Sequence, residues 1–204
     1  SKKLIWVLLF LVSAFSFLIG SVPSGYLIGK SKGVDLKSKG SGNIGASNVY
    51  RVLGKKEALF TLLFDMAKGF IAVLIVKQLP FAQNVKDILI PVSIIFVVLG
   101  HDFSIFLKFK GGKGVATTYG SILLYSNYAF VGLFLWILIL KVTKYASVAS
   151  LLSFTVATIL VIIFESSFKI KLVFLILLSL MVIKHFSNIT RLFTNSEYKI
   201  EGSV

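Results

Sequence analysis

Apolar residues gather in long runs, separated by short segments that carry most of the charge. The runs cover residues 4–29, 69–76, 88–100, 114–140, 145–164 and 172–183. A helix of about 20 apolar residues crosses the ~30 Å hydrocarbon core of a bilayer. The pattern therefore predicts an all-α, polytopic transmembrane helical bundle.

The number of spans depends on how the run 114–140 is read. It is either one tilted helix or two short helices parted at Ser126 and Asn127, so hydropathy alone allows six or seven spans. Basic residues concentrate on the cytoplasmic side of membrane proteins, and seven spans fit this rule better. Seven spans place the N-terminus outside and the C-terminus in the cytoplasm, although Lys2 and Lys3 then lie on the unfavoured side. The residues gathered on the cytoplasmic side are Lys30, Lys32, Lys37, Lys39, Arg51, Lys55, Lys56, Lys108, Lys110, Lys113, Lys141, Lys144, Lys184, Arg191 and Lys199.

The first run could be mistaken for a secretory signal, because lysines precede it and small residues follow. It is longer than the roughly 7–15 apolar residues of a signal core, so we count it as the first span. No polar linker divides the chain, and we expect a single transmembrane domain over residues 1–204.

Composition narrows the function classes. Hydrophobic residues make up 56% of the 204 residues, and the formal net charge is +14. Such a charge suits nucleic acid, anionic lipid or anionic substrates, but embedding in a membrane argues against nucleic acid. The chain has no cysteine, which excludes a disulfide framework, a thiolate nucleophile and a cysteine-based zinc site.

The most informative polar segment covers residues 39–51 and reads KGSGNIGASNVYR. Small residues let backbone N–H groups approach an anion, serine and asparagine add neutral donors, and Arg51 can fork two hydrogen bonds onto phosphate. The glycines also match G-x-G-x-x-G, but no strand precedes them, so a dinucleotide fold is rejected. A flexible turn between spans is the structural alternative. The candidate anion-binding residues are Gly40, Ser41, Gly42, Asn43, Gly45, Asn48 and Arg51.

A second glycine-rich segment, residues 109–117, reads FKGGKGVAT and leads into an apolar run. Gly111, Gly112, Lys113 and Gly114 would place free N–H groups and a positive charge at a helix N-terminus, which favours an anion. The segment is not a Walker A loop, because it lacks the first glycine and the Ser/Thr of that motif. Anchoring of the lysines at the lipid headgroups is the alternative.

Charged residues inside an apolar run are expected to pair. Asp65 and Lys68 are three residues apart and share a helix face, so we predict a structural ion pair that faces protein. The two histidines, His101 and His185, can act as general bases or as structural hydrogen-bonding groups, and we assign His101 to structure.

The sequence around the histidines excludes one class of enzyme. Neither is followed by the His-x4-Asp spacing of acyltransferases that use acyl-CoA, since Phe106 and Thr190 occupy the aspartate positions. The chain is therefore not expected to be an acyltransferase of that acyl-CoA-dependent class.

Together, the Gly20–Tyr26 block GSVPSGY, the segment 40–56, the block DMAKG at 65–69, the Gly100-His101 step and residues 109–117 resemble the bacterial acyl-phosphate:glycerol-3-phosphate acyltransferase family. The resemblance implies a seven-span enzyme of the cell inner membrane with its active site facing the cytoplasm. Ser47, Ser104 and the Phe186-Ser187 pair depart from the family pattern, which bears on local loop shape. By resemblance, the residues that hold phosphate and carry catalysis are Ser41, Arg51, Lys113, His185 and Asn188, joined in substrate binding by Ser147.

The resemblance further implies the reaction. A fatty acyl group passes from acyl phosphate to the 1-hydroxyl of glycerol 3-phosphate, giving lysophosphatidic acid and phosphate. The expected partners are these two substrates and membrane lipids, without acyl-CoA, cofactor or metal. The proton acceptor is either a substrate phosphate or His185, and both stay open. A transporter of a phosphorylated solute is the alternative from another class, and a structural lipid-binding protein is a third.

Overall fold

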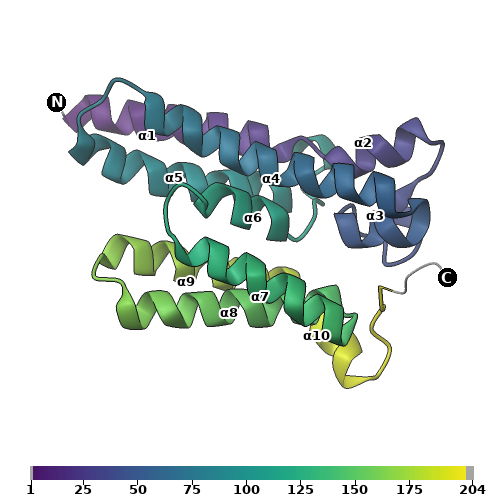
Figure 1. The fold of residues 1–204 in the computed structure, drawn as a ribbon. Helices are drawn as coiled ribbons and strands as arrows, with labels where there is room; N and C mark the ends of the chain where they lie inside the picture. Colours follow the sequence, from purple (N-terminus) through teal and green to yellow (C-terminus); the bar gives the residue numbers. More distant parts are fainter. Residues whose placement is uncertain (1, 201–204) are drawn as a thin grey trace.

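The computed structural model describes residues 2–200, and every regular element in this range is a helix (Figure 1). The elements, in chain order, are α1 (Lys2–Ser21), α2 (Ser24–Ser31), the 3-10 helix η1 (Leu36–Ser38), α3 (Ala46–Leu53), α4 (Lys55–Gln78), α5 (Gln83–Asp102), the 3-10 helix η2 (Ile105–Leu107), α6 (Val115–Ile122), α7 (Tyr128–Thr143), α8 (Ala146–Phe164), α9 (Phe168–Lys184) and α10 (Phe186–Phe193).

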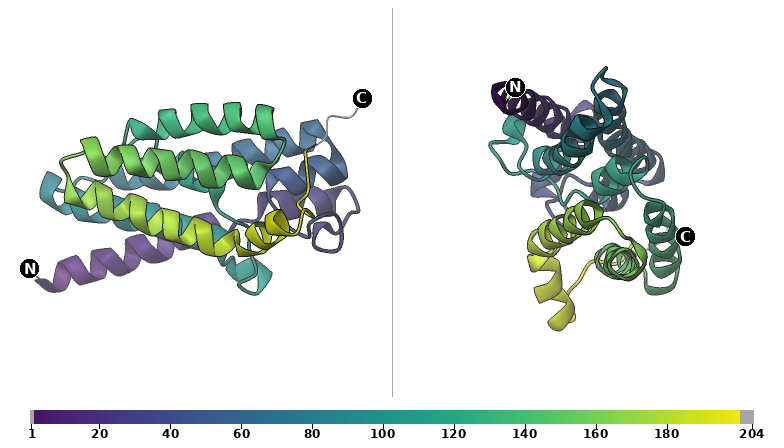
Figure 2. Two further views of the ribbon diagram at one scale, coloured as in Figure 1. Left: turned by 90° about the horizontal axis from the view of Figure 1, so that it is seen from below. Right: turned by 90° about the vertical axis from the view of Figure 1, so that its left-hand side faces the viewer.

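The long helices form two groups that pack side by side. α1, α4 and α5 lie together on one side, α7, α8 and α9 on the other, and the short helix α6 packs mainly on α4 (Figures 1 and 2). An aromatic series joins the groups: Tyr119 of α6 meets Phe154 of α8 edge-on at 5.8 Å, and Phe154 stacks on Phe174 of α9 at 5.5 Å. All three side chains are fully buried in the main core. The apolar patterning thus predicts the class of the fold correctly.

Glycines allow the closest helix contacts. A Cβ on Gly20 of α1 would lie 2.0 Å from the carbonyl oxygen of Val97 in α5, and one on Gly100 of α5 would lie 2.1 Å from that of Phe17. α4 and α6 meet in the same way, because a Cβ on Gly120 would lie 2.0 Å from the carbonyl oxygen of Met66. Small residues at such crossings let backbones approach, as is usual in membrane bundles.

The structure supports a multi-pass membrane protein, with fewer long helices than seven spans suggest. Four segments within residues 2–200 are long and apolar enough to cross a bilayer: Lys3–Ser31, Lys55–Gln78, Gln83–Leu107 and Ala146–Phe164. The pair α9 and α10, bent by 57°, makes a fifth if it forms one span. α7 is a shorter apolar helix, and the number and orientation of the spans stay predictions.

Two local features refine the sequence reading. The run 114–140 is divided, since α6 ends at Ile122 and α7 begins at Tyr128, which is the split that the charge distribution favoured. The segment 39–51 is not one continuous loop, because α3 begins at Ala46 and carries Arg51. Its glycines and asparagines suggested a turn throughout, whereas its second half, ASNVYRVL, has the polar and apolar faces of a short surface helix.

One end of the bundle collects the polar connections. α2, α3, the link from α5 to α6, the link from α7 to α8, and α10 all lie at the end where the described chain terminates (Figure 1). Both glycine-rich segments therefore lie at this end, with the candidate residues of the later helices.

Candidate active site

The first glycine-rich segment is folded around the side chain of Asn48. Its Oδ1 accepts a hydrogen bond from the backbone N–H of Ser41 at 2.9 Å. Its Nδ2 donates to the carbonyl oxygens of Lys39 at 3.0 Å and Asn43 at 2.8 Å. Gly40 has φ +57°, which an L side chain rarely adopts. Asn48, 1% exposed, therefore holds the loop and presents Ser41 at its surface.

Arg51 lies one helical turn after Asn48 on α3. Its Nε donates to the carbonyl oxygen of Lys199 at 3.1 Å and its Nη2 to that of Tyr198 at 2.9 Å. The chain near residue 200 thus returns to the first glycine-rich segment. The sequence gives no sign of this contact.

The second glycine-rich segment packs against the end of α5. The N–H of Gly111 donates to the carbonyl oxygen of Asp102, and that of Gly112 to the carbonyl oxygen of His101. A Cβ on Gly111 would lie 2.0 Å from the His101 carbonyl oxygen, and one on Gly112 would lie 2.2 Å from its Nε2. These two glycines are therefore required by close packing, and their N–H groups are already bonded within the protein.

A buried polar cluster lies next to the second glycine-rich segment, on the side of His101. Asp65 and Lys68 form the expected ion pair at 3.0 Å, and Ser24 donates to Asp65 at 2.7 Å. The Nζ of Lys68 lies 2.9 Å from Nδ1 of His101 and also donates to the carbonyl oxygen of Val22. The cluster ties α2, α4 and α5 together directly beneath Gly112.

Lys113 reaches from the loop to α10, where its ammonium donates to Oδ1 of Asn188. His185 lies at the bend before α10 and is 3% exposed. Its Nδ1 is 2.8 Å from the carbonyl oxygen of Met181, which can only accept. Nδ1 therefore carries the proton, and Nε2 of a neutral His185 remains an acceptor.

The electrostatics of the loop favour an anion. Burial, together with the nearby Arg191, lowers the pKa of Lys113 to about 8. Glu197 opposes this shift, while Arg51 and Lys184 add to it. Bringing several cations together in a half-buried place costs free energy, which an anionic ligand would offset.

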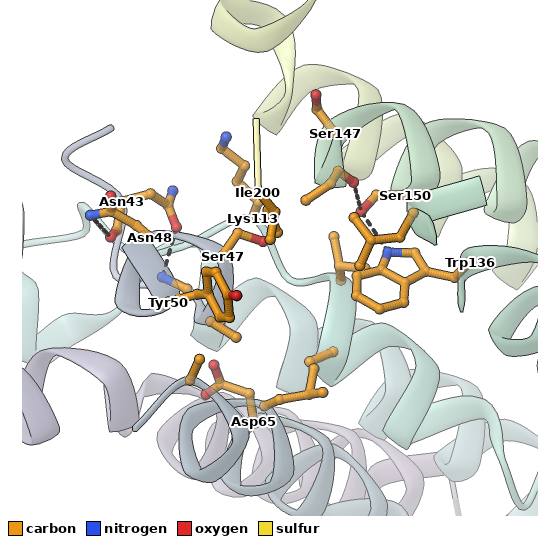
Figure 3. Close-up of a pocket in the computed structure, with 18 of the residues that line it drawn as sticks. Asn43, Ser47, Asn48, Tyr50, Asp65, Lys113, Trp136, Ser147, Ser150 and Ile200 are labelled. Carbon is orange, nitrogen blue, oxygen red and sulfur yellow. Dashed lines mark hydrogen bonds between the residues drawn. The ribbon is translucent and has the colours of Figure 1, made fainter. Parts of the chain in front are cut away.

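A cavity of about 580 Å³ lies between these elements. Its polar end is lined by Ser41, Arg51, Lys113, Ser147 and Asn188, and Figure 3 shows Lys113 and Ser147 among the lining residues. The Oγ of Ser147 is buried without a hydrogen-bond partner in residues 2–200. The rest of the lining is mainly apolar and includes Leu59, Leu62 and Met66 of α4, Tyr119 of α6, and Leu133, Trp136, Ile137 and Leu140 of α7. The cavity thus suits a molecule with an anionic head and an apolar tail.

The cavity gathers most of the candidate residues, though not all. Its lining includes Ser41, Asn43, Gly45, Asn48, Arg51, Lys113, Gly114, Ser147, His185 and Asn188. Gly40, Gly42, Gly111 and Gly112 lie outside the lining and shape the two loops. Asp65 and His101, expected to be structural only, also reach the cavity wall.

Sequence reasoning missed two groups of lining residues. Trp136 donates from Nε1 to Ser150 at 3.0 Å and forms part of the apolar wall. Glu197 and Ile200 close the polar end from the last described segment. Trp136 is an aromatic residue in an apolar run and looks like an ordinary lipid-facing position in the sequence. Glu197 and Ile200 belong to a short polar segment that looks like an ordinary surface segment. Within residues 2–200, no group of three or more His, Cys, Asp or Glu side chains could hold a metal ion.

Comparison with known proteins adds independent information. The family model described as glycerol-3-phosphate acyltransferase matches residues 10–195. The chain is 41% identical to a glycerol-3-phosphate acyltransferase of Wolbachia pipientis subsp. Culex pipiens (strain wPip), over 93% of this chain and 97% of that protein. It is 43% identical to one of Bartonella henselae, over 93% of this chain and 90% of the relative.

Solved structures agree with the sequence relatives. The fold is similar to that of PlsY (YgiH), an integral membrane glycerol 3-phosphate acyltransferase, in a crystal structure of its glycerol 3-phosphate form. The TM-score is 0.85 and the identity 35%, with 94% of each chain covered. A second crystal structure, of the lysophosphatidic acid form, gives a TM-score of 0.82 at 34% identity, again with 94% of each chain covered.

Proposed function

The chain belongs to the glycerol-3-phosphate acyltransferase family, and from this premise we propose how its cavity binds the substrates and transfers the acyl group. It is an integral membrane enzyme that forms lysophosphatidic acid, and its family, the PlsY type, uses acyl phosphate as the donor. The observation that carries the proposal is the convergence of polar residues from separate helices on one cavity whose other wall is apolar.

The polar end binds the phosphate groups of both substrates. Lys113 and Arg51 supply positive charge, Ser41 and Ser147 supply hydroxyl donors, and Asn188 fixes the Lys113 ammonium. Charge-assisted hydrogen bonds from such groups are about twice as strong as neutral ones. Ser147, whose Oγ lacks a protein partner, gains one when a phosphate oxygen arrives.

The apolar wall formed by α4 and α7 holds the acyl chain. Leu62 and Met66 face this part of the cavity from α4, and Leu133, Ile137 and Leu140 from α7. Each buried methylene contributes about 0.8 kcal/mol, so a long chain anchors the donor while its phosphate stays at the polar end. The mixed anhydride carbonyl then lies between the two regions.

The reaction requires alignment more than covalent catalysis. The 1-hydroxyl oxygen of glycerol 3-phosphate bonds to the acyl carbon, and the bond from that carbon to the phosphate oxygen of the donor breaks. Phosphate leaves with the bonding electron pair, and the hydroxyl proton passes to a base. Because acyl phosphate is already activated, holding both substrates in one pocket supplies much of the rate.

Two groups can accept the hydroxyl proton. One is a phosphate oxygen of a bound substrate, because both phosphates and the hydroxyl would share the polar end. The alternative is Nε2 of His185, which is free to accept because Nδ1 donates to Met181. Both are compatible with the cavity, and the variant described in the Discussion separates them.

The enzyme crosses the cell inner membrane seven times, with the cavity's polar end facing the cytoplasm. Support comes from the basic residues of the loops, which lie at the end of the bundle that holds Lys113 and Arg51. Beside the four long segments, α6, α7 and the bent pair of α9 and α10 then each count as a span. The phosphorylated substrates reach the site from the cytoplasm, and the product enters the surrounding membrane lipids.

The test uses purified protein in detergent with glycerol 3-phosphate and either acyl phosphate or acyl-CoA, without added metal. We expect lysophosphatidic acid from acyl phosphate only. Product from acyl-CoA, or dependence on a divalent cation, would contradict the proposed donor and the lack of a cofactor. The transporter alternative predicts flux of a phosphorylated solute in liposomes without ester formation, and the lipid-binding alternative predicts neither.

A further inference from the structure

The last described segment, residues 196–200, crosses the polar end of the cavity, and we call it the C-terminal strap. It is fixed at both ends: the N–H of Ser196 donates to the carbonyl oxygen of Arg191 at 2.8 Å, and that of Ile200 to the carbonyl oxygen of Lys144 at 2.8 Å. The strap therefore runs from α10 to the turn between α7 and α8. Glu197 and Ile200 line the cavity along this path.

The strap carries an aromatic ring that lies close to two guanidinium groups. The Tyr198 ring centroid lies 5.5 Å from Cζ of Arg51 and 5.3 Å from Cζ of Arg191. A guanidinium within about 6 Å of an aromatic ring is attracted by the negative face of the ring. One side chain thus contacts two arginines that reach it from different helices, α3 and α10.

The strap also satisfies part of the hydrogen bonding of Arg51. Nε and Nη2 donate to the carbonyl oxygens of Lys199 and Tyr198, which leaves further N–H groups of the fork for a phosphate. An arginine held in this way loses less side-chain entropy when a ligand binds.

A carboxylate of the strap offsets the positive charge of Arg191. Oε1 of Glu197 accepts from Nδ2 of Asn188 at 2.9 Å, and Oε2 lies 3.3 Å from Nε of Arg191. The Glu197 side chain is 3% exposed. Asn188 is thus oriented by the strap on one side and bonds Lys113 on the other.

We propose that the C-terminal strap is a working part of the active site, in which Tyr198 is a positioning residue that holds Arg51 ready for phosphate. The inference rests on the proposed function, because it assigns Arg51 to phosphate binding. Tyr198 acts through Arg51 and has no direct part in the chemistry. Its removal should therefore weaken ground-state binding of a phosphorylated substrate and leave the chemical step largely intact.

The test measures steady-state constants for both substrates in two variants of Tyr198. Tyr198→Leu removes the ring, and we expect KM for glycerol 3-phosphate or acyl phosphate to rise about five- to tenfold, with kcat within about twofold. Tyr198→Phe keeps the ring and should restore KM toward the wild-type value. Phe193→Leu is the matched control, because Phe193 is an 86% exposed aromatic residue on α10 outside the cavity lining.

Two outcomes of this experiment would overturn the inference. One is unchanged KM for both substrates in Tyr198→Leu, and the other is an equal loss in Tyr198→Phe, which would point to the hydroxyl. An inactive wild-type enzyme would instead contradict the proposed function, so the two failures are distinguishable.

A labelling experiment provides a second arm if Tyr198→Leu does not fold. The chain has no cysteine, so Ile200→Cys introduces a single thiol at the cavity wall. We expect saturating glycerol 3-phosphate to protect this thiol from a soluble maleimide. Labelling at the same rate with and without the substrate would show that the strap does not lie over the binding site.

Discussion

Asn188 accepts a hydrogen bond from the ammonium of Lys113, although 75 residues separate them in the chain. The contact joins the glycine-rich loop before α6 to the helix α10 at the far end of the sequence. Both side chains line the cavity, each from its own element. The proposed phosphate site therefore depends on a contact between distant parts of the chain.

Removing the charge of Lys113 should abolish most activity. For Lys113→Met we expect kcat/KM to fall about 100-fold or more, because a half-buried cation no longer binds phosphate and Oδ1 of Asn188 loses its partner. Lys110→Met is the control, since Lys110 is an exposed lysine of the same loop outside the cavity lining. Equal activity of the two variants in the detergent assay would contradict a phosphate-binding role for Lys113.

The pKa of Lys113 predicts a pH dependence of binding. With a pKa lowered to about 8 by burial and by Arg191, Lys113 is charged below that pH and loses its proton as pH rises through it. Bound phosphate requires the charged form, so KM for glycerol 3-phosphate should be steady near pH 7 and increase above pH 8. Steady-state kinetics with saturating donor measure this. The increase should be absent in Lys113→Met, and a wild-type KM that stays constant through pH 9 would be inconsistent with the assignment.

The sequence predicts the fold class and most of the residues that line the polar end of the cavity, because both depend on local patterns. Long apolar runs identify helices in lipid, and the break in the run 114–140 follows from charge distribution. Lys113 and Arg51 stand out as cations beside glycines. Local patterns do not show which groups a glycine contacts. Gly111 and Gly112 pack closely against His101, but in the sequence they look the same as glycines of an anion-binding loop.

The parts that sequence reasoning missed depend on long-range contacts. Glu197 and Tyr198 lie in a short polar tail, and their importance comes from contacts with Asn188 and Arg51 that no local pattern encodes. Asn48 was expected to bind substrate, yet its side chain is occupied by the loop that it holds. That Asn48 contributes to substrate binding stays a prediction. The structure shows that its side chain holds the loop that carries Ser41.

Replacing His185 should identify the proton acceptor. If Nε2 of His185 takes the hydroxyl proton, His185→Ala should lower kcat by about 10²- to 10⁴-fold with little change in substrate binding. If a substrate phosphate is the base, kcat should fall much less, and KM should change instead because the lining of the polar end is altered. Steady-state kinetics, combined with equilibrium binding of glycerol 3-phosphate, distinguish His185 from a substrate phosphate as the base. Loss of binding with an intact chemical step refutes His185 as the base.

The apolar residues of α7 that line the cavity predict how the enzyme discriminates between acyl donors of different chain length. Ile137 and the neighbouring Leu138 are similarly exposed, at 50% and 48%, but only Ile137 belongs to the cavity lining. Ile137→Trp should fill the space for the distal part of the chain, while Leu138→Trp should only enlarge the lipid-facing surface. The pair forms a matched test of which side of α7 contacts the donor.

We expect Ile137→Trp to lower kcat/KM for a long-chain acyl phosphate by about tenfold or more relative to a short-chain one, since each methylene denied burial costs about 0.8 kcal/mol. KM for glycerol 3-phosphate should stay unchanged, because the polar end is untouched. Leu138→Trp should keep the wild-type ratio of long-chain to short-chain rates. If both variants shift this ratio equally, the effect comes from the bilayer or the fold, and the acyl chain does not lie along the cavity wall between α4 and α7.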